Sequence, residues 1–162
     1  MFRPYDENLL AAFAAHAAIA LDNARLIGHF LEKQRIQATL NVAREIQLSL
    51  LPSGEPEVDG FELAGSSKAC DETGGDYYDF IDLGQGHWGI VIGDVTGHGV
   101  GSALLMAAAR ATLRTVAADA SDVREVVTRL NRSMAADMGQ GRFMTLFYGI
   151  LESGSGRLTY VN

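Results

Sequence analysis

Two short acidic segments, each flanked by glycines and each adjoining an apolar strand-like run, constrain this chain most. They are residues 74–80 (Gly-Gly-Asp-Tyr-Tyr-Asp-Phe) and residues 93–99 (Gly-Asp-Val-Thr-Gly-His-Gly). The glycines let the backbone turn sharply beside a carboxylate, and the adjoining strands would hold that carboxylate rigidly. Carboxylate oxygens are the ligands that hard divalent cations such as Mg²⁺ and Mn²⁺ prefer. We therefore predict that Asp76 and Asp94 are two halves of one metal site.

Turn and periodicity signals after residue 56 predict an ordered series of strands and helices. The two strands beside the acidic segments are joined by Gly84-Gln85-Gly86, which is a hairpin signal. The expected elements are strands at 61–67, 77–83 and 87–95, helices at 100–116 and 122–138, and strands at 143–151 and 157–162. Because hairpins and not crossovers connect the strands, we predict an α+β fold with an antiparallel sheet.

Each of the two predicted helices carries an apolar face, and Ser121 is the expected N-cap of the second helix. The residues expected to be buried are Leu104, Leu105, Ala108 and Leu113 in the first helix and Val123, Val126, Val127, Leu130 and Met134 in the second.

Residues 6–51 predict one long helix, with Asp6 as its N-cap and Pro52 as its stop. At 1.5 Å per residue it would extend roughly 70 Å. Its apolar side chains recur at steps of three and four residues. This seam comprises Leu10, Phe13, Ala17, Ala20, Ala24, Ile27 and Leu31, and it then shifts to Ile36, Leu40, Ala43, Ile46 and Leu50.

The helix cannot bury such a stripe by itself, so we predict a homodimer in which two copies of the helix pair. The alternative is two shorter helices that are broken near Gly28 and folded back on the domain. The seam shift between Leu31 and Ile36 suggests two helix packings of similar energy, through which a signal could reach the rest of the chain.

The composition indicates a globular, acidic protein. Of the 162 residues, 48% are hydrophobic, and the net charge is −7. No basic stripe of the kind that nucleic-acid binding needs is present, so we expect no nucleic-acid partner. An acidic protein that acts on a phosphate would need a metal to supply positive charge.

We expect the chain to be cytoplasmic. Its one cysteine, Cys70, is expected to be a small buried residue and suits a reducing compartment. The apolar run at 9–21 is short and interrupted by His16, so we expect no membrane span, and the first residues do not resemble a signal peptide. Asp71 and Glu72 are expected to be a solvated pair.

The loop from Asp94 to Gly101 admits three interpretations. It could hold a metal, with the following helix N-terminus attracting a phosphate. It could be a nucleotide loop, although its glycine spacing fits neither a dinucleotide fingerprint nor a P-loop. It could also be a structural turn in which Asp94 caps the helix. The second glycine-flanked aspartate, Asp76, favours the metal.

Several motifs together resemble one enzyme family. They are Glu-Ile-Gln-x-x-Leu-Leu-Pro at 45–52, the two acidic segments, Ala-Leu-Leu-Met-Ala at 103–107, Phe-Met-Thr-Leu-Phe-Tyr-Gly at 143–149 and Leu-Thr-Tyr-Val-Asn at 158–162. In this order they resemble the bacterial sporulation-stage-II and stress-response branch of the PPM phosphatases. Residues 5–30 resemble the closing helix of a GAF sensor domain. The expected parts are that helix at 1–30, a helical linker or switch at 31–52, and the N-terminal part of a phosphatase domain at 53–162.

The resemblance implies a two-sheet sandwich flanked by helices, with two manganese or magnesium ions between the sheets. Asp94 would contact both ions, Asp76 one, and the Val95 carbonyl would contribute a further ligand. Water activated by the ions would attack phosphoserine or phosphothreonine on a protein, often an anti-sigma factor antagonist. The resemblance therefore implies a protein serine/threonine phosphatase in bacterial signalling.

Further residues lie near this expected site. Asp79 and Thr96 would orient the ligands, or would only make strand-end and turn hydrogen bonds. Gly97 and Gly99 would lie near the phosphate. His98 could donate a proton to the leaving oxygen, but a solvated or loop-packing role is favoured.

The resemblance also implies that later motifs, with further metal-binding aspartates, complete the catalytic domain. We therefore expect this chain alone to bind metal weakly and to hydrolyse little or nothing. The competing hypothesis is a dimerising signalling module that binds a partner without catalysis.

Overall fold

The computed structural model describes residues 3–68, 72–120, 122–139 and 141–162. The predictions made for Cys70, Asp71 and Ser121 lie outside the described residues. The chain divides into two compact units, residues 1–39 and residues 40–162.

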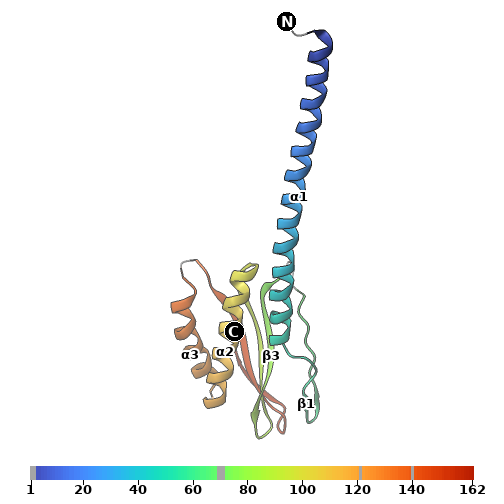
Figure 1. Cartoon of the computed structure of the whole chain (residues 1–162). Helices are drawn as coiled ribbons and strands as arrows, with labels where there is room; N and C mark the ends of the chain where they lie inside the picture. The colour runs from blue at the N-terminus through green and yellow to red at the C-terminus, as the bar shows by residue number, and fades with distance from the viewer. Residues whose placement is uncertain (1–2, 69–71, 121, 140) are drawn as a thin grey trace. The chain divides into compact units, whose positions relative to one another are not determined.

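A single helix, α1 (Pro4–Leu50), spans the boundary between these units (Figure 1). It continues through Gly28, so the long helix is confirmed and the alternative of two broken helices is wrong. Asp6 is not the N-cap, because it lies inside the first turn, where its Oδ2 accepts a hydrogen bond from the Arg3 N–H at 3.0 Å. This is the reach-back contact of a capping box, and Pro4 suits the first turn because it has no N–H to satisfy.

The predicted seam of α1 is uncovered in the single chain. Leu10, Phe13, Ile27, Leu31 and Ile36 are between 53% and 70% exposed. Ala17, Ala20 and Ala24 are exposed too, whereas Leu40 is half-buried. By length and composition, residues Tyr5–Leu50 are also apolar enough to cross a membrane, a test that core helices and signal sequences pass as well.

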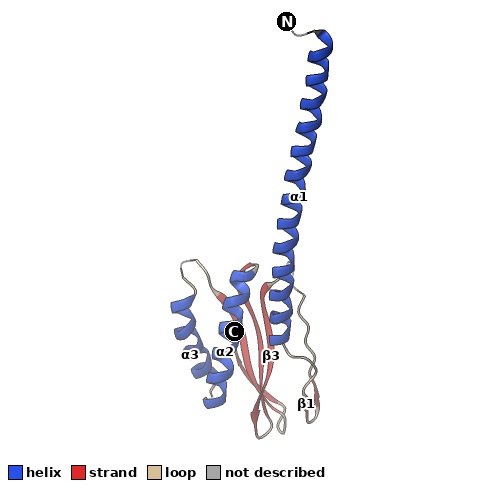
Figure 2. Cartoon of the chain, in the orientation of Figure 1, coloured by secondary structure: helices blue, strands red, loops and turns tan. Residues whose placement is uncertain are grey.

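Four strands form the main antiparallel sheet of the second unit, drawn in red in Figure 2. They are β3 (Gly74–Gly84), β4 (His87–His98), β5 (Met144–Glu152) and β6 (Arg157–Val161), and each pairs with the next in the chain. The predicted α+β class is thereby confirmed. The predicted strand at 61–67 is wrong in length, because β2 (Phe61–Glu62) has two residues and pairs only with β1 (Glu57–Val58).

Helices α2 (Val100–Asp119) and α3 (Val123–Asp137) pack on one face of this sheet (Figure 1). Asp122 is the N-cap of α3, and its side chain accepts a hydrogen bond from the Arg124 N–H at 3.0 Å. The core between helices and sheet contains Tyr77, Val91, Val95, Met106, Leu113, Val126, Leu130 and Tyr148, among others.

The predicted face of α3 is correct, because Val123, Val126, Leu130 and Met134 are buried and Val127 packs against them. The predicted face of α2 is partly wrong. Leu104 is 66% exposed and Ala108 is exposed, while Met106 and Ala109 are fully buried. In an alanine-rich helix several faces are almost equally apolar, so periodicity alone does not determine the rotation.

Side chains of β3 alternate between the two faces of the sheet. Tyr77, Asp79 and Ile81 are buried on the helix-covered face. Asp76, Tyr78 and Phe80 point to the opposite face, which α2 and α3 do not cover.

Candidate metal centre

Asp76 and Asp94 stand directly opposite each other on neighbouring strands. The register of β3 and β4 pairs Asp76 with Asp94, and both side chains are exposed. Directly opposed residues on antiparallel strands have Cβ atoms about 4.5–5.5 Å apart. The structure therefore brings together the two carboxylates that the sequence analysis singled out, on the face of the sheet away from α2 and α3.

A register irregularity beside this pair adds a third oxygen. Gly74 pairs with His98, and Asp76 pairs with Asp94, so Gly75 alone faces the three residues 95–97 of β4. A methyl group at Gly75 would collide with the Val95 carbonyl oxygen and would lie 3.0 Å from Asp94 Oδ1. Both oxygens thus converge on the residue next to Asp76. Bulges of this kind commonly re-aim groups beside functional sites.

Neither carboxylate is neutralised within the part of the chain that the structure describes. The ion pairs found there involve Asp79, Glu125 and Glu152, but neither Asp76 nor Asp94. Two like charges directly opposed across a sheet repel each other. A cation between them would remove that repulsion.

The oxygen donors fit a hard cation in kind but supply only part of the ligand number. Two carboxylates and one carbonyl are oxygen ligands, whereas Mg²⁺ takes about six in octahedral geometry and keeps several waters. Within the described residues, no group of three or more His, Cys, Asp and Glu side chains could hold a metal. The remaining positions would need water or ligands from elsewhere.

Asp79 is placed on the other face of the sheet, away from the Asp76–Asp94 pair. It is fully buried, and Arg114 of α2 donates to both of its oxygens at 2.6 and 2.7 Å. The Tyr77 hydroxyl donates to Asp79 Oδ2 at 2.8 Å, and Arg110 lies 3.9 Å from the same oxygen. This geometry is neither of the two roles considered for Asp79, because its carboxylate makes hydrogen bonds and an ion pair within the core.

The charges of this cluster influence each other. Burial, together with the Asp79 carboxylate, raises the pKa of Tyr77 well above its usual value. The hydrogen bond to Asp79 raises the pKa of Arg114, which stays cationic. On the same face, burial raises the pKa of Tyr148 to about 12.

The loop after Asp94 is anchored to neighbouring segments. The Thr96 N–H donates to the Phe143 carbonyl at 2.9 Å, and the Thr96 hydroxyl accepts from the Phe143 N–H at 3.1 Å. Thr96 therefore makes the turn hydrogen bonds considered for it. Gly97 and Gly99 have φ of 96° and 76°, which favours glycine, and the space where their side chains would lie is open. His98 is exposed.

Sequence reasoning missed the two arginines that bind Asp79, and it named Gln47 only as part of the motif at 45–52, without a partner. Arg110 and Arg114, one turn apart on α2, meet a strand carboxylate that lies 35 positions from Arg114. Gln47 of α1 bonds to Gly74, 27 positions away. For the arginines, the available signal was their i, i+4 spacing.

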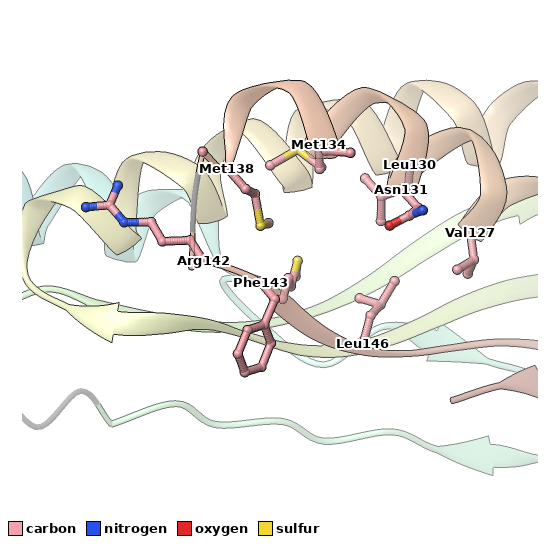
Figure 3. Close-up of a pocket in the computed structure, with 11 residues that line it drawn as sticks. Val127, Leu130, Asn131, Met134, Met138, Arg142, Phe143 and Leu146 are labelled. Atoms are coloured by element: carbon pink, nitrogen blue, oxygen red, sulfur yellow. The ribbon is translucent and has the colours of Figure 1, made fainter.

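Two cavities differ in character. One of about 80 Å³ is lined by Asp76 and Gly74 together with Arg44, Gln47 and Lys68, among others. Another of about 320 Å³ lies between α3 and the start of β5 and is mainly apolar. Figure 3 shows Val127, Leu130, Met134, Met138, Phe143 and Leu146 around it. Its lining contains neither Asp76 nor Asp94, whereas the smaller cavity is lined by Asp76, though not by Asp94.

Comparison with known proteins finds several proteins of one family that are similar to this chain. The family model described as Stage II sporulation protein E (SpoIIE) matches residues 84–162, a range that includes Asp94 and begins after Asp76. Among curated proteins, the chain is 27% identical over 150 residues to Protein IcfG of Synechocystis sp., covering 76% of this chain and 24% of that protein. It is 25% identical over 130 residues to the phosphoserine phosphatase RsbU of Bacillus subtilis, covering 80% of this chain and 38% of RsbU.

Two further matches agree with these. The phosphoserine phosphatase RsbP of Bacillus subtilis is 27% identical over 135 residues, covering 80% of this chain and 33% of RsbP. The crystal structure of the RsbU and RsbW domains of Rv1364c from Mycobacterium tuberculosis superposes with a TM-score of 0.50 at 32% identity, covering 60% of this chain and 26% of that one. The chain thus spans about a quarter to two fifths of its curated relatives.

These matches, the antiparallel fold and the order of the motifs agree with one another. In sequence and in fold, the chain is similar to the SpoIIE/RsbU-like branch of the PPM phosphatases. The likeness of residues 5–30 to a GAF helix stays a prediction.

Proposed function

We propose that this chain contributes Asp76, Asp94 and the Val95 carbonyl to a manganese or magnesium centre that dephosphorylates phosphoserine or phosphothreonine on a protein. The observation that supports this most is the direct opposition of Asp76 and Asp94 across β3 and β4, and among the described residues neither carboxylate takes part in an ion pair. The relatives named phosphoserine phosphatases supply the reaction class. An anti-sigma factor antagonist is the substrate that the family resemblance favours.

The chain's own groups would each have a defined task. The two carboxylates hold cations at the open face of the sheet, and the Val95 carbonyl adds a neutral ligand. The bound ions would supply an acidified water and neutralise charge on the transferred phosphoryl group. Gly97 and Gly99 leave open space beside the pair, where the phosphate of a substrate can approach.

Calorimetric titration with Mn²⁺ tests the centre directly. Asp94→Asn and Asp76→Asn should each weaken Mn²⁺ binding by at least about tenfold, because each removes a charged ligand. Asp82→Asn is the matched control, since Asp82 is an exposed carboxylate on the same strand that bonds only locally, to the Gly84 N–H. Absence of Mn²⁺ uptake by the unaltered chain would instead favour the non-catalytic signalling module.

Hydrolysis should depend on additional chain. With Mn²⁺ and a chromogenic phosphate monoester, we expect little turnover from these 162 residues and clear turnover from a longer chain that continues past Asn162. The proposal rests on the incomplete set of ligands and on the coverage of the relatives. Robust turnover by the 162-residue chain would contradict the expected need for further ligands.

We also propose that α1 pairs with a second copy of itself. The support is the stripe of exposed apolar side chains that runs along the helix. Leu31→Asn combined with Ile36→Asn should convert a dimer to a monomer in analytical ultracentrifugation and should alter the activity of the longer chain. If neither property changes, this arrangement is wrong.

A further inference from the structure

The first residue of β3 is held by a side chain from α1. The Gly74 N–H donates to Gln47 Oε1 at 3.2 Å, and Gln47 Nε2 donates to the Gly74 carbonyl at 2.6 Å. One amide group therefore bonds both backbone groups of one residue. β3 is an edge strand of its sheet. The Gln47 amide therefore makes the backbone hydrogen bonds that a further strand would otherwise make with Gly74.

The residues on both sides of Gly74 are fixed as well. The Gly99 N–H donates to the carbonyl of the buried Thr73 at 3.2 Å. Gly75 packs against the Val95 carbonyl with no room for a side chain. Asp76 follows at once. The start of β3 is thus clamped by α1 on one side and by β4 and its loop on the other.

Two consecutive glycines make these contacts necessary. Glycine loses more backbone freedom on ordering than any other residue, so a Gly-Gly pair at the start of an edge strand resists being fixed. The Asp76 backbone can hold its carboxylate opposite Asp94 only if the preceding residues stay in register. Gln47 is half-buried, and it lines the same cavity of about 80 Å³ as Asp76.

We propose that Gln47 is a positioning residue for the metal centre: by bonding Gly74 at both its N–H and its C=O, it holds Asp76 in register with Asp94. This inference rests on the proposed metal centre. It also means that the final turns of α1 act on the centre through one amide group. A displacement of that helix end would release Gly74 and loosen the cation ligands.

Gln47→Met tests this assignment, because methionine keeps the length of the side chain and removes both hydrogen bonds. Glu45→Met is the matched control, since it introduces the same residue at an exposed position of the same helix. Two quantities are measured on the full chain: the Kd for Mn²⁺ by calorimetry, and amide hydrogen exchange at residues 74–76 and in β5. Gln47→Glu, which keeps one acceptor and loses the donor, is the second variant.

Gln47→Met should raise the Kd for Mn²⁺ about tenfold, the usual cost of losing a group that orients a metal ligand. Exchange at residues 74–76 should accelerate about tenfold while β5 is unchanged, and Glu45→Met should alter neither quantity. For Gln47→Glu, the Kd for Mn²⁺ and the exchange rate at residues 74–76 should lie between those of the unaltered chain and those of Gln47→Met. If Gln47→Met does not fold, the values for Gln47→Glu decide whether the positioning role holds.

The outcomes separate this inference from the proposed function. Unchanged Mn²⁺ affinity in Gln47→Met, with normal binding by the unaltered chain, overturns the positioning role alone, even if exchange accelerates or the melting temperature falls. Unchanged exchange at residues 74–76 overturns it too. Failure of the unaltered chain to bind Mn²⁺ overturns the metal centre and this inference together.

Discussion

Two carboxylates on β3, only three residues apart, occupy opposite environments. Asp79 is fully buried under α2, receives two hydrogen bonds from Arg114 and a third from Tyr77, and has Arg110 nearby. Asp76 is exposed on the other face, opposite Asp94, and its strand partner brings a second negative charge instead of a positive one.

The difference separates a structural acid from a candidate ligand. Burying a carboxylate is tolerated only when paired charges and hydrogen bonds offset the lost hydration, and Asp79 has both. Asp76 and Asp94 gain nothing from each other in folding, because like charges repel across a strand pair. A pair that opposes folding and converges with a backbone carbonyl has the chemistry of a cation site.

The largest expected effect is a loss of stability when the buried carboxylate of Asp79 is replaced. Asp79→Asn should lower the free energy of unfolding by about 2–3 kcal/mol, because it leaves the Arg114 charge without its partner. The value lies below that for a fully buried pair, since the Arg114 side chain is 41% exposed and water can reach it. Urea denaturation at an unchanged m-value measures this loss.

Asp76→Asn serves as the control on the same strand and should show no such loss. If both variants were equally destabilised, the distinction between the two faces would be wrong.

A second expected effect concerns the packing that brings the open-face oxygens together. Gly75→Ala should destabilise the fold by about 1–2 kcal/mol, because its methyl group would meet the Val95 carbonyl and force β3 and β4 apart. The same change should weaken Mn²⁺ binding. Gly54→Ala is the control, since nothing lies within 4 Å of the added methyl group. Unfolding and metal titration of the two variants would measure both effects.

The fold could be predicted from local signals, because Gly84-Gln85-Gly86 and the alternating strands on either side specify a hairpin without reference to the rest of the chain. The opposition of Asp76 and Asp94 follows from the same hairpin. Partners that come from different elements could not be predicted. Arg114 reaches Asp79 only because α2 has a particular rotation on the sheet, and periodicity misjudged that rotation at Leu104.

Gln47 illustrates the same limit. Its bonding partner is a backbone group, which carries no residue-specific signal, and it lies 27 positions away. The prediction of a strand at 61–67 failed for a related reason. A strand forms only where another strand pairs with it, and residues 63–68 pair with no strand and have no regular secondary structure.

The third expected effect is a dependence of stability on alkaline pH that arises from Tyr77. Burial and Asp79 raise its pKa above the ordinary 10.0, so the folded chain keeps a proton that the unfolded chain loses. The stabilisation is complete well below pH 10 and falls as the pH rises through 10, by on the order of 1 kcal/mol at pH 10.5. Tyr77→Phe should remove this part of the slope in unfolding measured from pH 8 to 10.5.

Tyr148→Phe measures how much a second buried hydroxyl adds to this slope, because burial raises the pKa of Tyr148 to about 12 and its folded form also keeps its proton above pH 10. Among the residues that the structure describes, the Tyr148 hydroxyl is buried without a hydrogen-bond partner, so its removal should cost little stability. A slope between pH 8 and 10.5 that is identical in Tyr77→Phe and the unaltered chain would contradict the role assigned to Tyr77.

The smallest expected effect is a gain of stability, and it concerns Asp94 on the face opposite α2 and α3. Without divalent metal, Asp94→Asn should raise the free energy of unfolding by about 0.5 kcal/mol, because it removes one of two like charges directly opposed on β3 and β4. With saturating Mn²⁺ the order should reverse, since only the unaltered chain gains stability from binding the ion. Paired urea denaturations with chelator and with Mn²⁺ measure both halves of the effect. A loss of stability in chelator would mean that Asp94 makes a favourable contact within the fold, and it would place Asp94 with Asp79 among the structural acids.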